Sequence, residues 1–203
     1  LHVRSRRQRQ MCIRDRVQAA LRQIGISSDN PQGLFISGYF AEEEKRFAIP
    51  YNMVLASNVD ELNFLASRLE TLSTGERAEL NAALQAPQSE LFSIGRITDF
   101  PENVDYYVHL PDVHGPAQLG DYYLNRSGMV DMPEEWKGGI DTAQFGRYVA
   151  QQEQGAFTQY GYLVKSGDEW QKVHEGQPVP EEYRVLSFPA PEVLRNAANI
   201  PPP

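Results

Sequence analysis

Hydrophobic side chains recur at helical spacing over residues 58–86, the most regular stretch of the chain. Two capping-box patterns divide this stretch, because Asn58 is followed three positions later by Glu61, and Ser73 by Glu76. In such a box each side chain accepts a hydrogen bond from the backbone N–H of the other residue, which favours the start of a helix. The pattern predicts two helices joined by a short turn and packed antiparallel as a helical hairpin.

Shorter patterns surround this hairpin. Helical spacing predicts further helices over residues 17–23, 89–101, 118–126, 133–136 and 141–152. Short hydrophobic runs bounded by turn residues predict strands over residues 34–40, 47–55, 156–158, 162–164 and 183–188, and a short strand or an extended connection over 105–110. The strands at 156–158 and 162–164 are expected to form a β-hairpin, whereas Pro50 places the strand at 47–55 at a sheet edge or a bend.

Together these elements predict an α+β fold. We expect a small N-terminal αβ region over residues 17–56, a helical subdomain with the hairpin over 57–100, and a C-terminal region over 101–190. The C-terminal region would combine helices with a small antiparallel sheet. Residues 191–203 end in three prolines and are expected to form a frayed tail.

Two glycines lie inside predicted helices, Gly120 in the sequence Leu-Gly-Asp-Tyr and Gly146 in Phe-Gly-Arg-Tyr. Glycine destabilises a helix interior by about 1 kcal/mol relative to alanine. Its use at two such positions indicates that another helix packs closely against the backbone at both.

Charge changes character at residue 16. Residues 1–16 hold six arginines and one aspartate, so the other 187 residues carry a net charge of −13 in a chain whose net charge is −8. The string RQRQMCIRDR at residues 7–16 looks like translated sequencing-adapter read-through. We therefore expect residues 1–16 to be a disordered assembly artefact. The alternative is a basic arm that binds nucleic acid.

Several classes of protein are disfavoured by composition. Cys12 is the only cysteine and lies in the suspect segment, so a disulfide framework or a Cys-based zinc site within the remaining chain is excluded. No apolar run approaches the roughly 18 residues of a membrane span, and the first residues lack the apolar middle of a secretory signal. We expect a cytoplasmic protein without a membrane partner.

The best enzyme-like cluster is His109, Asp112 and His114, since imidazole and carboxylate ligands suit zinc or non-haem iron. Pro111 interrupts the cluster, and only His174 could add a third imidazole, so we interpret these residues as polar loop positions. Phosphate-binding glycine loops and the G-x-S-x-G nucleophile motif are missing from the sequence. We predict a protein that is not an enzyme and has no cofactor or metal.

Acidic residues are dense between residues 99 and 141, where the only bases are Arg126 and Lys137. This stretch carries a net charge of −7 and would repel a phosphate backbone, so direct binding of nucleic acid through the tyrosine clusters is disfavoured. The acids of this stretch are Asp99, Glu102, Asp105, Asp112, Asp121, Asp131, Glu134, Glu135 and Asp141.

The helix sequence NVDELNFLASRLETL at residues 58–72 resembles that of ArdA-type antirestriction proteins and ArdA-like mobile-element proteins of gut Firmicutes. The later motifs LGDYY at 119–123, PEEW at 133–136 and FGRY at 145–148 are similar to the family in the same order. The resemblance extends over about residues 58–165, whereas residues 17–56 depart from the N-terminal β-domain pattern of the family.

The resemblance implies an elongated acidic protein that can form a homodimer. Such a protein imitates bent DNA and blocks the DNA groove of a type I restriction–modification enzyme. The nine acids between residues 99 and 141 would then form the mimic surface. Duplex DNA carries one charge per ~1.7 Å, so the 26 acids beyond residue 16 would match ~44 Å of duplex if they shared one face. The alternative is a non-enzymatic interaction or regulatory module of a conjugative element or phage, using an apolar patch on the hairpin.

Overall fold

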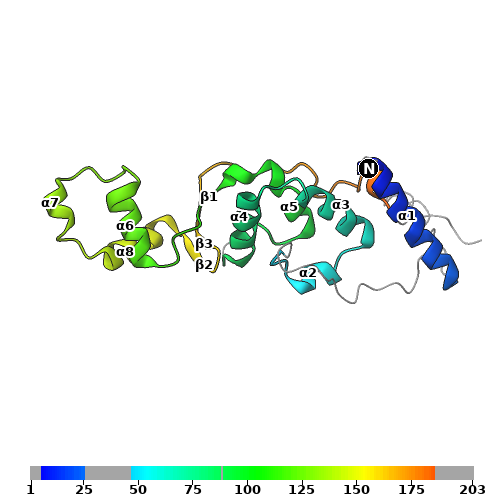
Figure 1. Cartoon of the computed structure of the whole chain (residues 1–203), viewed down its shortest axis with the longest axis horizontal. Coiled ribbons are helices and arrows are strands. Elements are labelled where there is room, and N and C mark those ends of the chain that lie inside the picture. The colour runs from blue at the N-terminus through cyan, green and yellow to red at the C-terminus, as the bar shows by residue number, and fades with distance from the viewer. Residues whose placement is uncertain (1–5, 26–46, 88, 186–203) are drawn as a thin grey trace, which may run out of the picture.

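The computed structural model describes residues 6–25, 47–87 and 89–185 and shows an elongated molecule (Figure 1). One end holds α1 (Arg6–Gln23), and the helices α2 (Tyr51–Leu55), α3 (Val59–Leu69), α4 (Thr74–Gln85) and α5 (Ile94–Thr98) lie between α1 and the middle of the molecule. A small sheet comes next, and α6 (Pro116–Asp121), α7 (Glu134–Lys137) and α8 (Thr142–Glu153) form the opposite end. The α+β fold class is confirmed.

Both predicted capping boxes are present. The backbone N–H of Glu61 donates to Asn58 Oδ1 at 2.9 Å at the start of α3, and that of Glu76 donates to Ser73 Oγ at 3.3 Å at the start of α4. The two helices are joined by a short turn as predicted, but the prediction that they pack mainly against each other is wrong. Helix α3 packs against α5, whereas α4 packs against the strands, so each helix covers its own part of the core.

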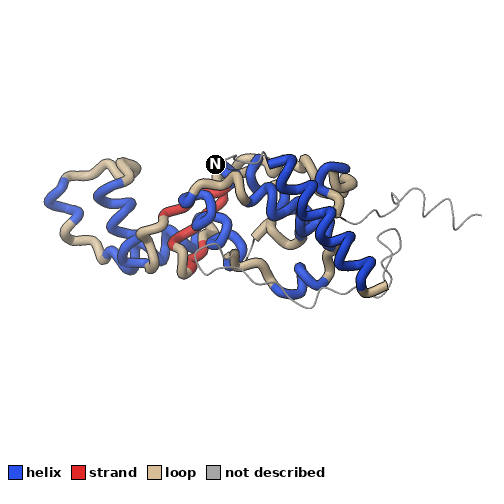
Figure 2. Tube along the Cα trace, turned by 45° about the vertical axis from the view of Figure 1, so that its right-hand side comes forward, coloured by secondary structure: helices blue, strands red, loops and turns tan. Residues whose placement is uncertain are grey.

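The sheet separates two hydrophobic cores. Its strands β1 (Tyr107–Leu110), β2 (Ala156–Thr158) and β3 (Gly161–Lys165) are antiparallel in the order β1-β3-β2, which confirms the predicted hairpin and the strand before it. Because neighbouring side chains on a strand point to opposite faces, Leu163 joins the larger core of α3–α5 and Tyr162 joins a smaller core with Val113 and Leu119. The strands lie between the two groups of helices in Figure 2, and this arrangement elongates the molecule.

After β3 the chain returns along the helical part toward α1 (Figure 1). Trp170 packs edge-on against Tyr106 with 5.1 Å between ring centroids, and the short helix η5 (Glu181–Tyr183) contacts α1 and α3. The strand predicted over 183–188 is wrong for its described residues, 183–185. The backbone N–H of Val185 donates to the Asp60 side chain at 2.6 Å, and the described part shows no strand partner there.

Other predictions differ near the N-terminal end and before α5. Residues 51–55 form α2 where a strand was expected. Pro50 directly precedes the first turn of this helix, and at a helix start its missing N–H removes no helical hydrogen bond. The helix predicted over 17–23 belongs to the longer α1, so residues 6–16 are helical where disorder was expected. Helix α5 starts only after Ser93, whose hydroxyl caps it. The strand predicted at 34–40 and the tail at 191–203 lie outside the described residues.

Candidate functional site: an acidic interaction surface

Helices α6 and α8 cross in direct backbone contact. A Cβ atom added to Gly120 would lie 1.9 Å from the carbonyl oxygen of Thr142, and one added to Gly146 would lie 1.8 Å from that of Pro116. Distances this short are impossible for real side chains, so only glycine fits at either position. The close packing predicted from the two helix-interior glycines is confirmed.

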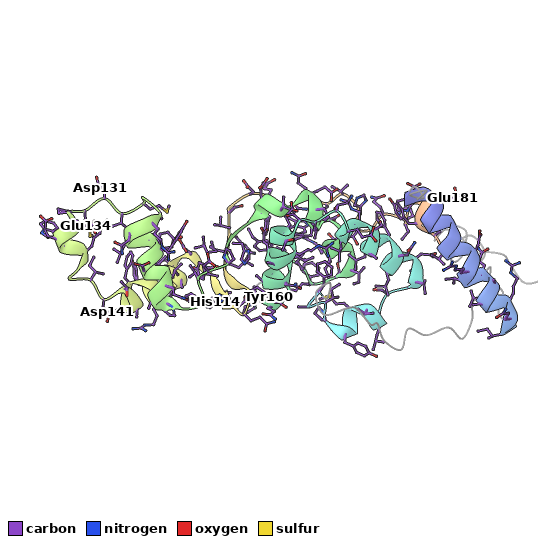
Figure 3. The ribbon with its side chains drawn as sticks, in the orientation of Figure 1. His114, Asp131, Glu134, Asp141, Tyr160 and Glu181 are labelled. Carbon is purple, nitrogen blue, oxygen red and sulfur yellow. The ribbon has the colours of Figure 1, made fainter. Side chains whose placement is uncertain are left out.

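Residues 127–141 project beyond this crossing, and we call this segment the acidic tip. It leaves the π-helical turn Tyr122–Arg126, passes through α7 and returns to α8, and α7 has no buried residue. Trp136 is 66% exposed within it. Four exposed carboxylates flank this tryptophan in the sequence: Asp131, Glu134, Glu135 and Asp141. Figure 3 labels Asp131, Glu134 and Asp141 at the far end of the molecule.

The nine acids predicted as a mimic surface fall into different environments. Asp105 and Asp112 are exposed like the four acids of the tip, and Asp121 is half-buried beside Arg126 at 3.3 Å. Asp99 is 0% exposed, and Glu102 is half-buried and paired with Arg68. The prediction that all nine form one exposed surface is therefore wrong for the buried Asp99, and Glu102 and Asp121 are only partly exposed and are ion-paired.

Asp99 instead anchors the returning C-terminal segment. Its carboxylate accepts hydrogen bonds from the backbone N–H groups of His174 at 2.6 Å and Glu175 at 3.2 Å. The side chain of Asn103 also binds this segment, accepting from the backbone N–H of Gln171 at 2.7 Å. Two buried polar side chains thus hold one backbone segment against the α3–α5 core.

Basic side chains in the described part are largely occupied. Arg77 and Arg184 donate to backbone carbonyls. Six others form ion pairs: Arg68, Arg96, Arg126, Lys137, Lys165 and Lys172. By contrast, Asp105, Asp112, Asp131 and Glu135 are in no ion pair among the described residues. These exposed carboxylates therefore leave their negative charge facing solvent.

Glu153 ties the α6–α8 pair to the sheet. The hydroxyl of Tyr162 on β3 donates to Glu153 Oε2 at 3.0 Å, and that of Tyr123 in the π-helical turn donates to Oε1 at 2.5 Å. Burial, followed by the hydrogen bond to Glu153, raises the pKa of both tyrosine hydroxyls, so both remain neutral donors. A lone glutamate in the last turn of a helix gives no sequence signal for this role, and it was not predicted.

The three candidate histidines make separate contacts. His109 Nε2 lies 2.7 Å from the carbonyl oxygen of Tyr160, and the backbone N–H of His114 donates to Gln118. The ring of His174 packs against Phe64 in the returning segment, with 5.0 Å between centroids. Across the described ranges, no group of three or more His, Cys, Asp and Glu side chains is arranged to hold a metal ion.

The apolar patch expected by the alternative hypothesis is not found on residues 58–86, where every large hydrophobic side chain is at least partly buried. Within the described part of the chain, no helix combines the length and apolar character needed to cross a bilayer.

Comparison with known proteins identifies the family. The model of the antirestriction protein (ArdA) family matches residues 11–164, which include both cores and the acidic tip. The match begins within residues 1–16, so it overlaps the end of the suspect leader. A search of curated proteins returns no match. Because the family match extends over well over half of its length, this chain belongs to the ArdA family of antirestriction proteins.

Proposed function

We propose that this protein is a DNA mimic that acts in the cytoplasm and blocks the DNA groove of a type I restriction–modification enzyme. Exposed carboxylates take the place of DNA phosphates, and the protein performs no chemistry on its partner. The observation that carries the proposal is the combination of an elongated shape with exposed acids in no ion pair, in a member of an antirestriction family (Figures 1 and 3).

The mimic surface consists of the six exposed acids of the predicted set. These are Asp105, Asp112, Asp131, Glu134, Glu135 and Asp141. An enzyme groove that binds DNA is lined with basic side chains. Complementary charge between the groove and its partner raises the association rate and selects the partner. The ion pairs of Arg96, Lys165 and Lys172 support this role, because they reduce the exposed positive charge that would repel such a groove.

A restriction-protection assay tests the proposal. Cells that carry a type I system and express the protein are challenged with unmodified phage or plasmid, and we expect the recovery of unmodified DNA to rise. With purified components, the protein should compete with DNA for the enzyme, and the competition should weaken as salt screens the charges. Protection that is absent, or binding that is unaffected by salt, contradicts the mimic mechanism.

Charge-neutral variants locate the surface. The double variant Asp131→Asn with Glu135→Gln removes two exposed charges from the tip, and we expect a higher concentration to be needed for half-inhibition. The matched control, Asp131→Glu with Glu135→Asp, keeps both charges and should inhibit like the wild type. Equal inhibition by the neutral variant would place the mimic surface elsewhere.

We propose further that the active form is a homodimer, as the resemblance to ArdA proteins implies. Two copies would double the length of acidic surface presented to the enzyme. Analytical ultracentrifugation at assay concentrations should give a sedimenting mass near twice 23.0 kDa. Full inhibition by a strictly monomeric protein would refute this point.

A further inference from the structure

We propose that Gly120 and Gly146 are positioning residues that set the direction of the acidic tip and thereby its fit to the enzyme. This inference rests on the proposed function, because it concerns how the tip meets its partner. It assigns a role to two residues that carry no charge and lie outside the tip.

The two glycines face each other where the helices cross. A Cβ on Gly146 would lie 2.8 Å from the backbone nitrogen of Gly120, and a Cβ on Gly120 would lie 3.1 Å from that of Gly146. The helix backbones therefore meet without side chains between them. An alanine at either position must push the helices apart, because its Cβ contact of 1.8–1.9 Å has to reach about 3.4 Å.

None of the tip residues 127–141 is buried. Helix α7 has no buried residue, so the place of the tip depends on the two helix ends that hold it, at Arg126 and at Asp141. Each end lies five or six residues from its glycine, about 8–9 Å along a helix. A separation of about 1.5 Å at the crossing is therefore carried directly into the tip.

The C-terminal end of α8 is held to the sheet. Glu153 at the end of α8 receives hydrogen bonds from Tyr123 and from Tyr162, which is 0% exposed on β3. Because the hydrogen bond from Tyr162 holds the C-terminal end of α8 to the sheet, widening at the glycines tilts the tip relative to the sheet. The four carboxylates of the tip then move together relative to Asp105 and Asp112, the exposed acids outside the tip.

The test compares Gly120→Ala and Gly146→Ala with a matched control, Gly75→Ala, in the full chain. Gly75 also lies in a helix, but a Cβ there meets nothing within 4 Å. We expect about a tenfold rise in the half-inhibitory concentration for the two crossing variants, since each exposed charge pair contributes little and four are displaced together. The control should inhibit like the wild type.

A second measurement follows the geometry itself. Spin labels at Lys137→Cys and Gln159→Cys, with Cys12→Ser, report the distance between the tip and the β2–β3 turn. We expect a shifted distance distribution in both crossing variants and an unchanged one in the control. If a crossing variant does not fold, Tyr123→Phe takes its place in this measurement. It weakens the hydrogen bonding at Glu153 without adding an atom, and it should broaden the distance distribution.

The outcomes separate the two proposals. A wild-type protein that does not inhibit the enzyme refutes the proposed function, whereas the distances still test the positioning role. An inhibiting wild type together with an unchanged distance distribution in the crossing variants overturns the positioning role alone. A shifted distribution with unchanged inhibition overturns its importance for the enzyme.

Discussion

The substitution Asp99→Asn tests whether an acid of the dense stretch acts through its contacts or through its charge. Asp99 is 0% exposed and accepts two backbone hydrogen bonds, from His174 and Glu175. Asparagine has nearly the same shape but only one acceptor oxygen, so its amide NH₂ would face one of these N–H groups. The variant therefore breaks one of the two bonds and leaves a buried donor without a partner.

The magnitude follows from these two contacts. A hydrogen bond to a charged group contributes roughly 1.5–3 kcal/mol, and a buried unsatisfied donor costs about 1–3 kcal/mol. The relief of burying a carboxylate offsets part of this loss, so we expect a net destabilisation of about 2–4 kcal/mol. For a chain of this length the melting temperature should fall by about 5–15 °C.

Thermal unfolding measured by circular dichroism supplies the readout, with Asp131→Asn as the matched control. Asp131 is exposed, and its substitution makes the same change in net charge. A surface change of this kind stays within about 0.5 kcal/mol, so the control should melt like the wild type. Below the melting temperature, Asp131→Asn should weaken inhibition, whereas folded Asp99→Asn should retain it.

Two results would refute this reasoning. If Asp99→Asn melts at the same temperature as Asp131→Asn, the carboxylate does not anchor the returning segment. If amide hydrogen exchange at residues 174 and 175 is equally slow in Asp99→Asn and in the wild type, the two hydrogen bonds do not protect these amides.

Three further changes test other parts of the fold. The pKa of Glu79 is raised from 4.5 to about 8, chiefly by burial, so stability should fall as the pH rises between these values. Glu79→Gln removes this decline, and its gain in melting temperature over the wild type should be larger at pH 8 than at pH 5. Tyr162→Phe removes one donor to Glu153 and should lower the unfolding free energy in urea by about 1–2 kcal/mol; an unchanged midpoint would argue against this hydrogen bond. Asn58→Ala should cost about 1 kcal/mol by the same measurement, and Asn58→Ser should restore it.

Local sequence was sufficient for much of the helical structure. The capping boxes at Asn58 and Ser73 work within a few residues of themselves, so their helices begin where the pattern predicts. The strands of the β2–β3 hairpin are likewise set by adjacent residues and a short turn. Pro50 shows the limit of such reasoning, because a proline before a short hydrophobic run is compatible with an edge strand or with a helix start.

The candidate site was predicted only in part. The density of acids and the resemblance to ArdA proteins pointed to the stretch that includes the tip, but they treated every acid in it alike. The role of Glu153 was not predicted, because its two tyrosine partners are 30 and 9 residues away in sequence. The glycines were noticed as a cost to their helices, yet only the crossing showed that they face each other.

The sequence by itself determined the family, the capped helices, the β2–β3 hairpin and the acidic character of this protein. Only the tertiary structure decided which acids are free to meet a partner. Asp99 and Asp131 are chemically identical, but a chain segment about 75 residues downstream covers the first, whereas the second is exposed in the described structure. Burial depends on contacts between residues distant in sequence, whereas charge is a property of each residue alone.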